Sequence, residues 1–471
     1  MSETTAGAPA PAAAPHAPLS EAAVRYALWM LLIVCILNFL DRQIVVYLQA
    51  PIKEELGLSD LQLGMMTGLA FALFYTILGI PIARWADNPK SNRVGIIAVA
   101  LAVWSGFTAL CGLATNFWQL LLARVGVGVG EAGCTPPAHS LIADYVAPDK
   151  RASAIAFYGL GIPIGSLLGG VLGGVIADVW DWRAAFFIVG LPGVALAAVV
   201  WWTLKEPRTW LAAADAARKA AAPAVPFAMA LKEILASKAF LWTCAAASVA
   251  AWVGYGLAAW TPQHFIRTFG LSNTEVGIWV GVTGGVGAAL GTWLGGVLAD
   301  RFGKQDIRHV MTVPAVGMAI GSVGVAAGLM LDNWVWALVA IWLPGLLNSM
   351  WYGPMFATVQ GVVAPHNRAL AAAIILFVLN LIGLGLGPTL IGAVSDMLAR
   401  DAFAAAGQAA AFGEVCVRGG PDAFRDACRA ATAQGLQGAI VGASVVGLAA
   451  AAFMWMARGH LAADMARARA A

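Results

Sequence analysis

Runs of about 20 or more mostly apolar residues recur along the chain, and this pattern limits what the chain can fold into. A helix needs about 20 such residues to cross the hydrocarbon core of a bilayer. Twelve runs are present, and they cover most of residues 24–458. With 60% hydrophobic and 11% charged residues, the chain differs strongly from a soluble domain. We therefore expect an all-α, multi-pass membrane protein with twelve transmembrane helices.

Positive charges are distributed unevenly over the connections between these runs. If the N-terminus is cytoplasmic, the cytoplasmic connections and both tails hold 19 of the 28 Lys and Arg residues, and the opposite connections hold 7. This bias predicts that both termini are cytoplasmic. It also accounts for the net charge of +3, which gives no reason to expect a nucleic-acid partner. We expect residues 1–23, rich in Ala and Pro, to be a disordered cytoplasmic tail, and residues 459–471 to be a second cytoplasmic tail.

The chain repeats itself at an offset of 213 to 218 residues. The segment LGLSDLQLGMMTG at 56–68 matches FGLSNTEVGIWVG at 269–281, and glycines and an aspartate of 165–178 match residues 383–396. This repeat predicts two pseudo-symmetric six-helix bundles, 24–204 and 239–458, joined by a cytoplasmic linker at 205–238. Two such halves place a binding site near the midplane and allow alternating access.

Several segments resemble the major facilitator superfamily. GVLADRFGK at 296–304 has the Gly, Asp-Arg and basic residues of its signature loop, and ARWADNPK at 83–90 is a less complete copy, with Ala83 for the glycine and Asn88 for the arginine. NFLDR at 38–42, RVGVGVGEA at 124–132, DWRAAFF at 181–187 and LKEPR at 204–208 resemble the Spinster-like branch, whose animal members resemble exporters of lysolipids and sphingolipid phosphates. The resemblance spans about 24–458. It implies the major facilitator fold, with helices 1, 4, 7 and 10 around the cavity. It also implies a cytoplasmic gate of Arg84, Asp87, Arg93, Asp300, Arg301 and Lys304.

Four ionisable residues fall deep inside the apolar runs: Asp41, Arg42, Arg124 and Glu131. Charged groups in the hydrocarbon region are costly, and by default they indicate function. On a helical wheel Arg124 and Glu131 share one face, and Gly126, Gly130 and Gly133 form an opposite stripe that is expected to pack against a neighbouring helix.

The repeat shows that this charge is confined to the first half. Asp41 corresponds to Gly254, Arg124 to Ile341 and Glu131 to Asn348. Arg124 would favour the charged form of both carboxylates, and moving it to an anionic ligand would release one of them to take a proton. We predict that the four charged residues handle protons and the head group of a substrate. A static ion pair that fixes helix 1 against helix 4 is the alternative.

Polar and aromatic residues beside an apolar wall suit an amphiphilic substrate. Packing and membrane-belt positions are the other interpretation of these residues, because the chain has 19 Trp and 19 Phe. The predicted cavity residues are Asn38, Tyr255, Trp260, Asn348, Trp351, Tyr352 and Asn380.

Two of the six cysteines, Cys416 and Cys428, fall in an insertion at about 400–433 that the topology places outside the cytoplasm. A disulfide can persist there, and two free thiols are the other interpretation.

No nucleotide-binding loop, metal-ligand motif or catalytic constellation is evident, so we expect neither an enzyme nor a cofactor, with the proton as coupling ion. We predict a monomeric, proton-coupled secondary active transporter that uses alternating access in the bacterial inner membrane. Its partners are membrane lipids and an amphiphilic anion or lysolipid-like substrate. A transporter of a small organic acid, sugar or drug is the alternative, and a receptor or scaffold without flux represents a different class.

Overall fold

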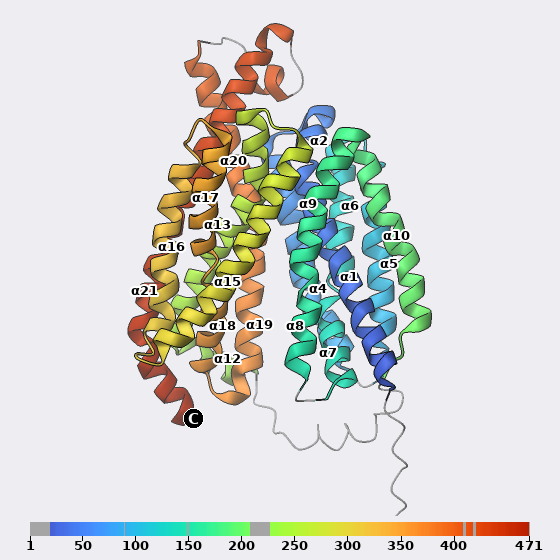
Figure 1. The fold of residues 1–471 in the computed structure, drawn as a ribbon, viewed down its shortest axis with the longest axis vertical. Coiled ribbons are helices and arrows are strands. Elements are labelled where there is room, and N and C mark those ends of the chain that lie inside the picture. Colours follow the sequence, from blue (N-terminus) through green and yellow to red (C-terminus); the bar gives the residue numbers. More distant parts are fainter. Residues whose placement is uncertain are drawn as a thin grey trace, which may run out of the picture.

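The computed structural model describes residues 19–88, 90–147, 150–207, 227–407, 411–417 and 421–470, and the regular elements in these ranges are helices (Figure 1). The first half forms α1 (Glu21–Tyr47), α2 (Gln49–Leu56), α3 (Asp60–Gly64), η1 (Met65–Leu69), α4 (Ala70–Asp87), α5 (Arg93–Cys111), α6 (Phe117–Glu131), α7 (Thr135–Tyr145), α8 (Arg151–Gly159), α9 (Gly161–Val179) and α10 (Trp182–Thr203). The second half forms α12 (Phe227–Leu235), α13 (Lys238–Phe269), α14 (Asn273–Val276), η2 (Gly277–Gly281), α15 (Val282–Gly303), α16 (His309–Gly328), α17 (Trp334–Asn348), α18 (Tyr352–Gly361), η3 (Pro365–Asn367), α19 (Arg368–Val378), η4 (Leu379–Leu386), α20 (Gly387–Ala405), η5 (Gly413–Val417), η6 (Asp422–Phe424) and α21 (Arg425–Ala470).

The helices form two groups that stand side by side, blue to green on the right of Figure 1 and yellow to red on the left. Eleven helical segments of the described chain are long and apolar enough to cross a membrane. The pair α6 and α7 supplies the twelfth span as an interrupted helix. The predicted all-α architecture of two six-helix bundles is therefore confirmed.

The apolar run over 117–145 forms two helices with a break between them. α6 ends at Glu131 and α7 begins at Thr135, just before Pro136 and Pro137. Proline has no N–H to donate, so these two residues cannot continue the hydrogen bonding of the preceding turn. The second half is divided at the equivalent place, where α17 ends at Asn348 and α18 begins at Tyr352.

The repeated GLS sequence encodes the same helix stop and start in both halves. Gly57 ends α2 and Gly270 ends α13 with φ angles of 59° and 69°, which favour glycine. Ser59 and Ser272 then each begin the next helix with a capping box, in which the serine side chain and the residue three positions later bond to each other's backbone N–H. These two starts lie at one end of the molecule, which we call the outer end. The opposite end, where α1 begins and α21 finishes, is the inner end.

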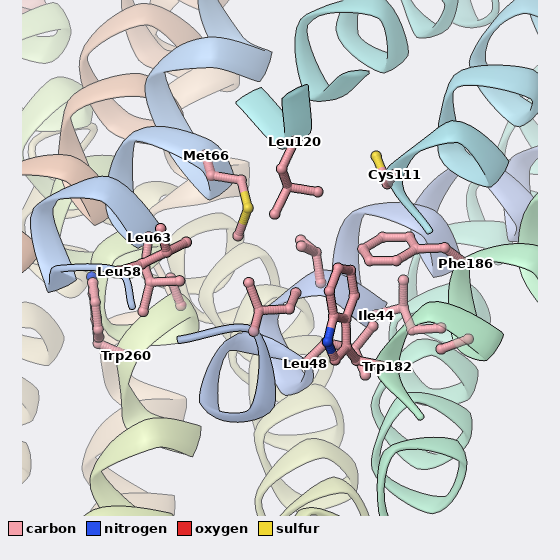
Figure 2. Close-up of a cluster of buried hydrophobic side chains, with 14 of the residues drawn as sticks. Ile44, Leu48, Leu58, Leu63, Met66, Cys111, Leu120, Trp182, Phe186 and Trp260 are labelled. Carbon is pink, nitrogen blue, oxygen red and sulfur yellow. The ribbon is translucent and has the colours of Figure 1, made fainter. Parts of the chain in front are cut away.

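The two halves meet at the outer end, where α3 packs on α20 and α14 packs on α9. A buried apolar cluster runs through this region (Figure 2), and Leu58, Leu63 and Trp260 in it come from different halves of the chain. The tightest contacts are between backbones. A Cβ atom on Gly64 would lie 2.4 Å from the Pro388 carbonyl oxygen, so only glycine fits there.

The predicted glycine stripe packs α6 and its extension against α5. A Cβ atom on Gly130 would lie 2.6 Å from the Trp104 backbone nitrogen, and one on Gly126 would clash with the Phe107 ring. Gly133 faces the Ala100 side chain in the same way. The prediction that this face packs is confirmed, and close packing of the glycine face leaves the charged face turned away from α5.

The predicted N-terminal tail, linker and C-terminal tail are described in part. Residues 1–18 and 208–226, which belong to the predicted tail and linker, lie outside the described residues. The described end of the linker forms α12, with Ala230 and Ile234 buried and Phe227 and Met229 exposed. At the C-terminus α21 continues to Ala470, so the predicted tail at 459–471 is helical throughout its described part.

Candidate functional site

The four predicted charged residues come together in the first half as two ion pairs. The Arg42 Nε atom donates to Glu131 Oε2 at 2.6 Å, and Arg124 Nη1 donates to Asp41 Oδ1 at 3.2 Å. Glu131 therefore has Arg42 as its direct hydrogen-bond partner, whereas Arg124 is in direct contact with Asp41. Both pairs join α1 to α6.

The two pairs differ in accessibility. The side chains of Asp41 and Arg124 are 2% and 1% exposed, and Glu131 is fully buried, whereas Arg42 is 16% exposed. Asp41 also accepts a hydrogen bond from the Thr108 hydroxyl on α5. Arg42 is thus the most accessible cation of the set, and the Asp41–Arg124 pair is enclosed between helices.

Three aromatic rings surround the Arg42 guanidinium. Its Cζ atom lies 4.9 Å from the Phe39 ring centroid, 4.7 Å from that of Phe71 and 4.6 Å from that of Tyr75. Phe71 also lies 5.8 Å from the Arg124 Cζ atom. Cation–π contacts of this kind favour the charged guanidinium in a site shielded from water.

Some buried polar atoms of this cluster have no hydrogen-bond partner among the described residues. They are Nδ2 of Asn38, Nε of Arg124 and Oε1 of Glu131. Buried donors and acceptors normally have a protein or water partner. The cluster therefore has free hydrogen-bonding capacity for a proton, a water molecule or a ligand group.

A cavity of about 370 Å³ lies next to helix α1, mainly within the second half. Its walls come from α13, α15 and α17, with Gln43 and Tyr47 of α1 and Ser166 of α9 on the side of the first half. Most lining residues are Ala, Val, Leu, Gly, Met or Trp. The volume is within the range of about 300–1,000 Å³ that is usual for ligand sites.

The repeat relates this cavity to the charged cluster. Gly254, Ile341 and Asn348, the counterparts of Asp41, Arg124 and Glu131, all line the cavity. The second half thus replaces two buried ion pairs by a mainly apolar hollow at the equivalent position.

The other predicted cavity residues have different surroundings. Asn348 and Trp351 line the cavity, and Asn38 is buried in α1. Tyr255 is 39% exposed and lies within electrostatic range of Tyr352 and, across the two halves, of Arg42 and Tyr75. Tyr352 is exposed, and Asn380 is half-buried in η4.

Trp260 does not line the cavity, which corrects that prediction. Its side chain is fully buried, and its indole N–H donates to the Pro388 carbonyl at 2.8 Å. It therefore packs α13 against α20 at the outer end.

The predicted gate residues divide into two groups. At the inner ends of α4 and α15, five side chains are exposed: Arg84, Asp87, Asp300, Arg301 and Lys304. Arg93 is fully buried and bonds within its own half, to Asp144 and Glu206. Arg93 thus clamps the inner ends of three helices of one half instead of facing the other half.

Cys416 and Cys428 form a disulfide in the outer insertion. The two cysteines and neighbouring aromatic residues pack around Phe403 and Phe412. This insertion lies beyond the end of the second half in Figure 1.

Sequence reasoning missed four residues that complete the charged site: Phe39, Phe71, Tyr75 and Thr108. In the sequence they are ordinary aromatic or hydroxyl residues within apolar runs. Their positions depend on how α4 and α5 pack against α1 and α6, and no spacing in the sequence reveals that.

Comparisons with known proteins agree with this architecture. The chain matches the family model described as Major Facilitator Superfamily over residues 31–388. An MFS-type efflux pump of Mycolicibacterium smegmatis is 31% identical over 375 residues, which cover 80% of this chain and 85% of that protein. Protein spinster homolog 3 of Danio rerio is 28% identical over 388 residues, covering 78% of this chain and 75% of that protein.

Among solved structures, the chain is similar to a bacterial homolog to the human lysosomal transporter Spinster in an inward-facing and unoccupied conformation. The TM-score is 0.84 at 32% identity, over 94% of this chain and 99% of that one. This chain belongs to the major facilitator superfamily, in which it is a transporter of the Spinster-like branch.

Proposed function

We propose that this transporter couples proton movement to alternating-access transport of an amphiphilic anion such as a lysolipid. One observation carries the proposal: two buried ion pairs in the first half and a mainly apolar cavity at the equivalent position in the second. An amphiphile has a charged head group that suits the ion pairs and an apolar tail that suits the cavity. The Spinster-like branch, whose animal members resemble exporters of lysolipids, supports the same class of substrate.

Arg42 is the residue that we expect to receive the anionic head group. It is the most accessible of the four charged side chains, and a guanidinium can bind a phosphate or carboxylate with two parallel hydrogen bonds. Tyr255, within electrostatic range of Arg42, offers a hydroxyl from the second half. The tail would then lie on the apolar residues around Ile341 and Trp351.

Glu131 is the residue that we expect to exchange the proton. Its charge is stabilised by Arg42, and it is fully buried. When a ligand anion binds Arg42 in place of Glu131, Glu131 is left as a buried carboxylate without a neighbouring cation. Such a carboxylate is neutralised by taking up a proton. Binding of the anion and uptake of a proton are linked in this way.

We also propose that the protein works as a monomer in a bacterial inner membrane, with both termini cytoplasmic. The outer end then faces away from the cytoplasm. Because the halves meet at that end, the structure corresponds to an inward-facing conformation, as described for the similar Spinster homolog.

Reconstitution into liposomes tests the proposal. Wild-type protein should move a lysophosphatidic acid labelled on its acyl chain in response to an imposed pH gradient, with matching acidification or alkalinisation of the lumen. Glu131→Gln should keep binding but lose the response to the gradient. Arg42→Gln should weaken binding by about tenfold or more, because it removes a charge-assisted contact.

Glu54→Gln, at an exposed carboxylate on α2, is the matched control and should behave like wild type in transport. If Glu131→Gln kept its full gradient response, Glu131 would not be the proton site. If the anion bound equally well to Arg42→Gln, the head-group assignment would be wrong.

A second candidate keeps the fold and changes the cargo to a drug-like molecule. The 31% identity to an efflux pump and the mainly apolar cavity favour it over a small sugar or organic acid. An uncharged lipophilic compound that is transported equally by wild type and Arg42→Gln would support this candidate. Tight binding of the lysolipid by folded protein, without flux, would instead indicate a receptor.

A further inference from the structure

We propose that Asp178 and Asp396 are paired latches that hold the outer end of this transporter shut. Each carboxylate belongs to one half of the chain and caps the start of a helix in the other half. The proposal rests on the alternating-access motion proposed above, but it does not depend on the cargo or on the coupling ion.

The first latch joins α20 to α3. Asp396 Oδ1 accepts the backbone N–H of Asp60 at 3.0 Å, and its Oδ2 accepts that of Leu61 at 2.8 Å. These are free N–H groups at the start of a helix, where a carboxylate is favoured by both hydrogen bonding and the helix dipole. Asp396 is 7% exposed, so this contact is shielded from solvent.

The second latch joins α9 to α14 in a similar way, with one backbone and one side-chain donor. Asp178 Oδ2 accepts the backbone N–H of Thr274 at 2.7 Å, and its Oδ1 accepts the Asn273 side-chain amide at 2.8 Å. Asp178 and Asp396 are counterparts in the repeat, as are Asn273 and Asp60. The two contacts are therefore one device used twice, once on each side of the molecule.

A glycine four residues before each aspartate brings the backbones together. A Cβ atom on Gly392 would lie 2.2 Å from the Asp60 carbonyl oxygen, and one on Gly174 would lie 2.3 Å from the Asn273 carbonyl oxygen. Each latch thus consists of a carboxylate cap and a close backbone contact. Neither contact can persist if the two halves separate at the outer end.

Buried charge strengthens the first latch only. Asp60, 1% exposed, accepts both Arg267 Nη atoms at 2.6 and 2.8 Å, the Ser395 hydroxyl at 2.7 Å, and the Lys53 ammonium. Arg267 and Ser395 belong to the second half, so this bidentate ion pair also crosses between halves. The second latch has the neutral Asn273 in place of Asp60. We infer that the Asp396 latch is the stronger of the two.

Distances between spin labels at the two ends test the latches without substrate or gradient. One label pair, at Leu113→Cys and Asp332→Cys, reports on the outer end, and another, at Lys150→Cys and Gln305→Cys, reports on the inner end; all four positions are exposed. Cys244→Ala provides the background, because the other free cysteines are buried.

Losing one cap should raise the ratio of outward-open to outward-closed molecules about three- to tenfold in Asp178→Ala, and by more in Asp396→Ala. The double variant should multiply the two effects, since the latches lie apart and do not share partners. The outer distance should increase while the inner distance decreases. Asp181→Ala is the matched control, because Asp181 caps α10 within its own half and should change neither distance.

Amide hydrogen exchange provides a second measurement if Asp396→Ala is poorly folded. In Asp396→Asn and Asp178→Asn, exchange should accelerate at residues 60–64 and 273–276 respectively. If the spin-label distance at the outer end and the amide hydrogen exchange were unchanged in all latch variants, the proposal that these aspartates hold the outer end shut would be overturned. A proton-coupling variant such as Glu131→Gln leaves this result unaffected, so failure of the latches and failure of the proposed coupling remain distinguishable.

Discussion

Glu131 and Asn348 end the half-helices α6 and α17 at equivalent positions of the repeat, but only Glu131 has a cation beside it. The position of Arg42, the cation beside Glu131, is occupied by Tyr255 in the second half, and Asn348 itself lines a mainly apolar cavity. The same backbone geometry therefore supports a charged site in one half and an uncharged site in the other. This asymmetry separates the handling of charge from the accommodation of an apolar group.

Asn348→Asp should destabilise the protein, because it places a carboxylate on the cavity wall, and the position equivalent to Arg42, the partner of Glu131, is occupied there by Tyr255. We expect a loss of about 1–3 kcal/mol, the cost of a polar group left without a partner. Thermal unfolding in detergent measures it. Asn333→Asp on the same helix is the control, because Asn333 caps the start of α17 and Asp is an equally good cap. Equal midpoints for the two variants would contradict the idea of an uncharged site.

Gly345→Leu should block the cavity without disturbing the fold. Gly345 lines the cavity, and a Cβ atom there would meet nothing within 4 Å. Because each buried methylene contributes about 0.8 kcal/mol, excluding two methylenes of a bound tail would weaken binding more than tenfold. Binding of a labelled lysolipid measures this effect. Gly442→Leu, at a similarly open position on α21, should leave binding unchanged, and a similar loss in both variants would show that the cavity is not responsible.

The sequence identified the charged residues of the site but not their pairing. Intramembrane charges are rare enough to be found in a sequence. Asp41 and Arg42 are adjacent, however, and on a helix they point about 100° apart, so each meets a different part of α6. Which carboxylate meets which arginine depends on the rotation and depth of two helices relative to each other. Phe71 and Tyr75 of α4 were missed for the same reason.

The repeat predicted the two bundles well because both halves use the same local signals. The GLS segments combine a glycine stop with a serine capping box, and these signals act within a few residues. Trp260 and Arg93 were misassigned because the position of a residue along a helix does not reveal its partners. Trp260 donates to the Pro388 carbonyl, and Arg93 binds carboxylates of its own half.

Arg93→Gln should destabilise the first half strongly, because Arg93 is fully buried between Asp144 and Glu206. Removing one partner of a buried ion pair costs about 3–5 kcal/mol, since the remaining charges lose their compensation. The thermal midpoint in detergent measures the effect. Arg84→Gln, at an exposed position of the same predicted gate, should change it little. If the two substitutions had equal effects on stability, Arg93 would not be the structural clamp that its contacts indicate.

Glu55 gives a pH-dependent test of the outer end. It lies on α2, and hydrogen bonds from the Arg183 guanidinium and the Trp182 indole lower the pKa of its carboxyl. A carboxyl whose pKa is lower in the folded state stabilises the protein above its unfolded pKa of about 4.3, and this contribution is lost as the pH falls through the folded value. The thermal midpoint of wild type should therefore exceed that of Glu55→Gln at pH 7, and the difference should shrink as the pH falls below about 4.

Because Glu55 is half-exposed, the difference between the two midpoints should also decrease with added salt. Glu54→Gln, at the exposed neighbouring residue, controls for the loss of a negative charge on α2. A difference between wild type and Glu55→Gln that stays constant from pH 7 to pH 3 would mean that the ion pair with Arg183 does not stabilise the fold.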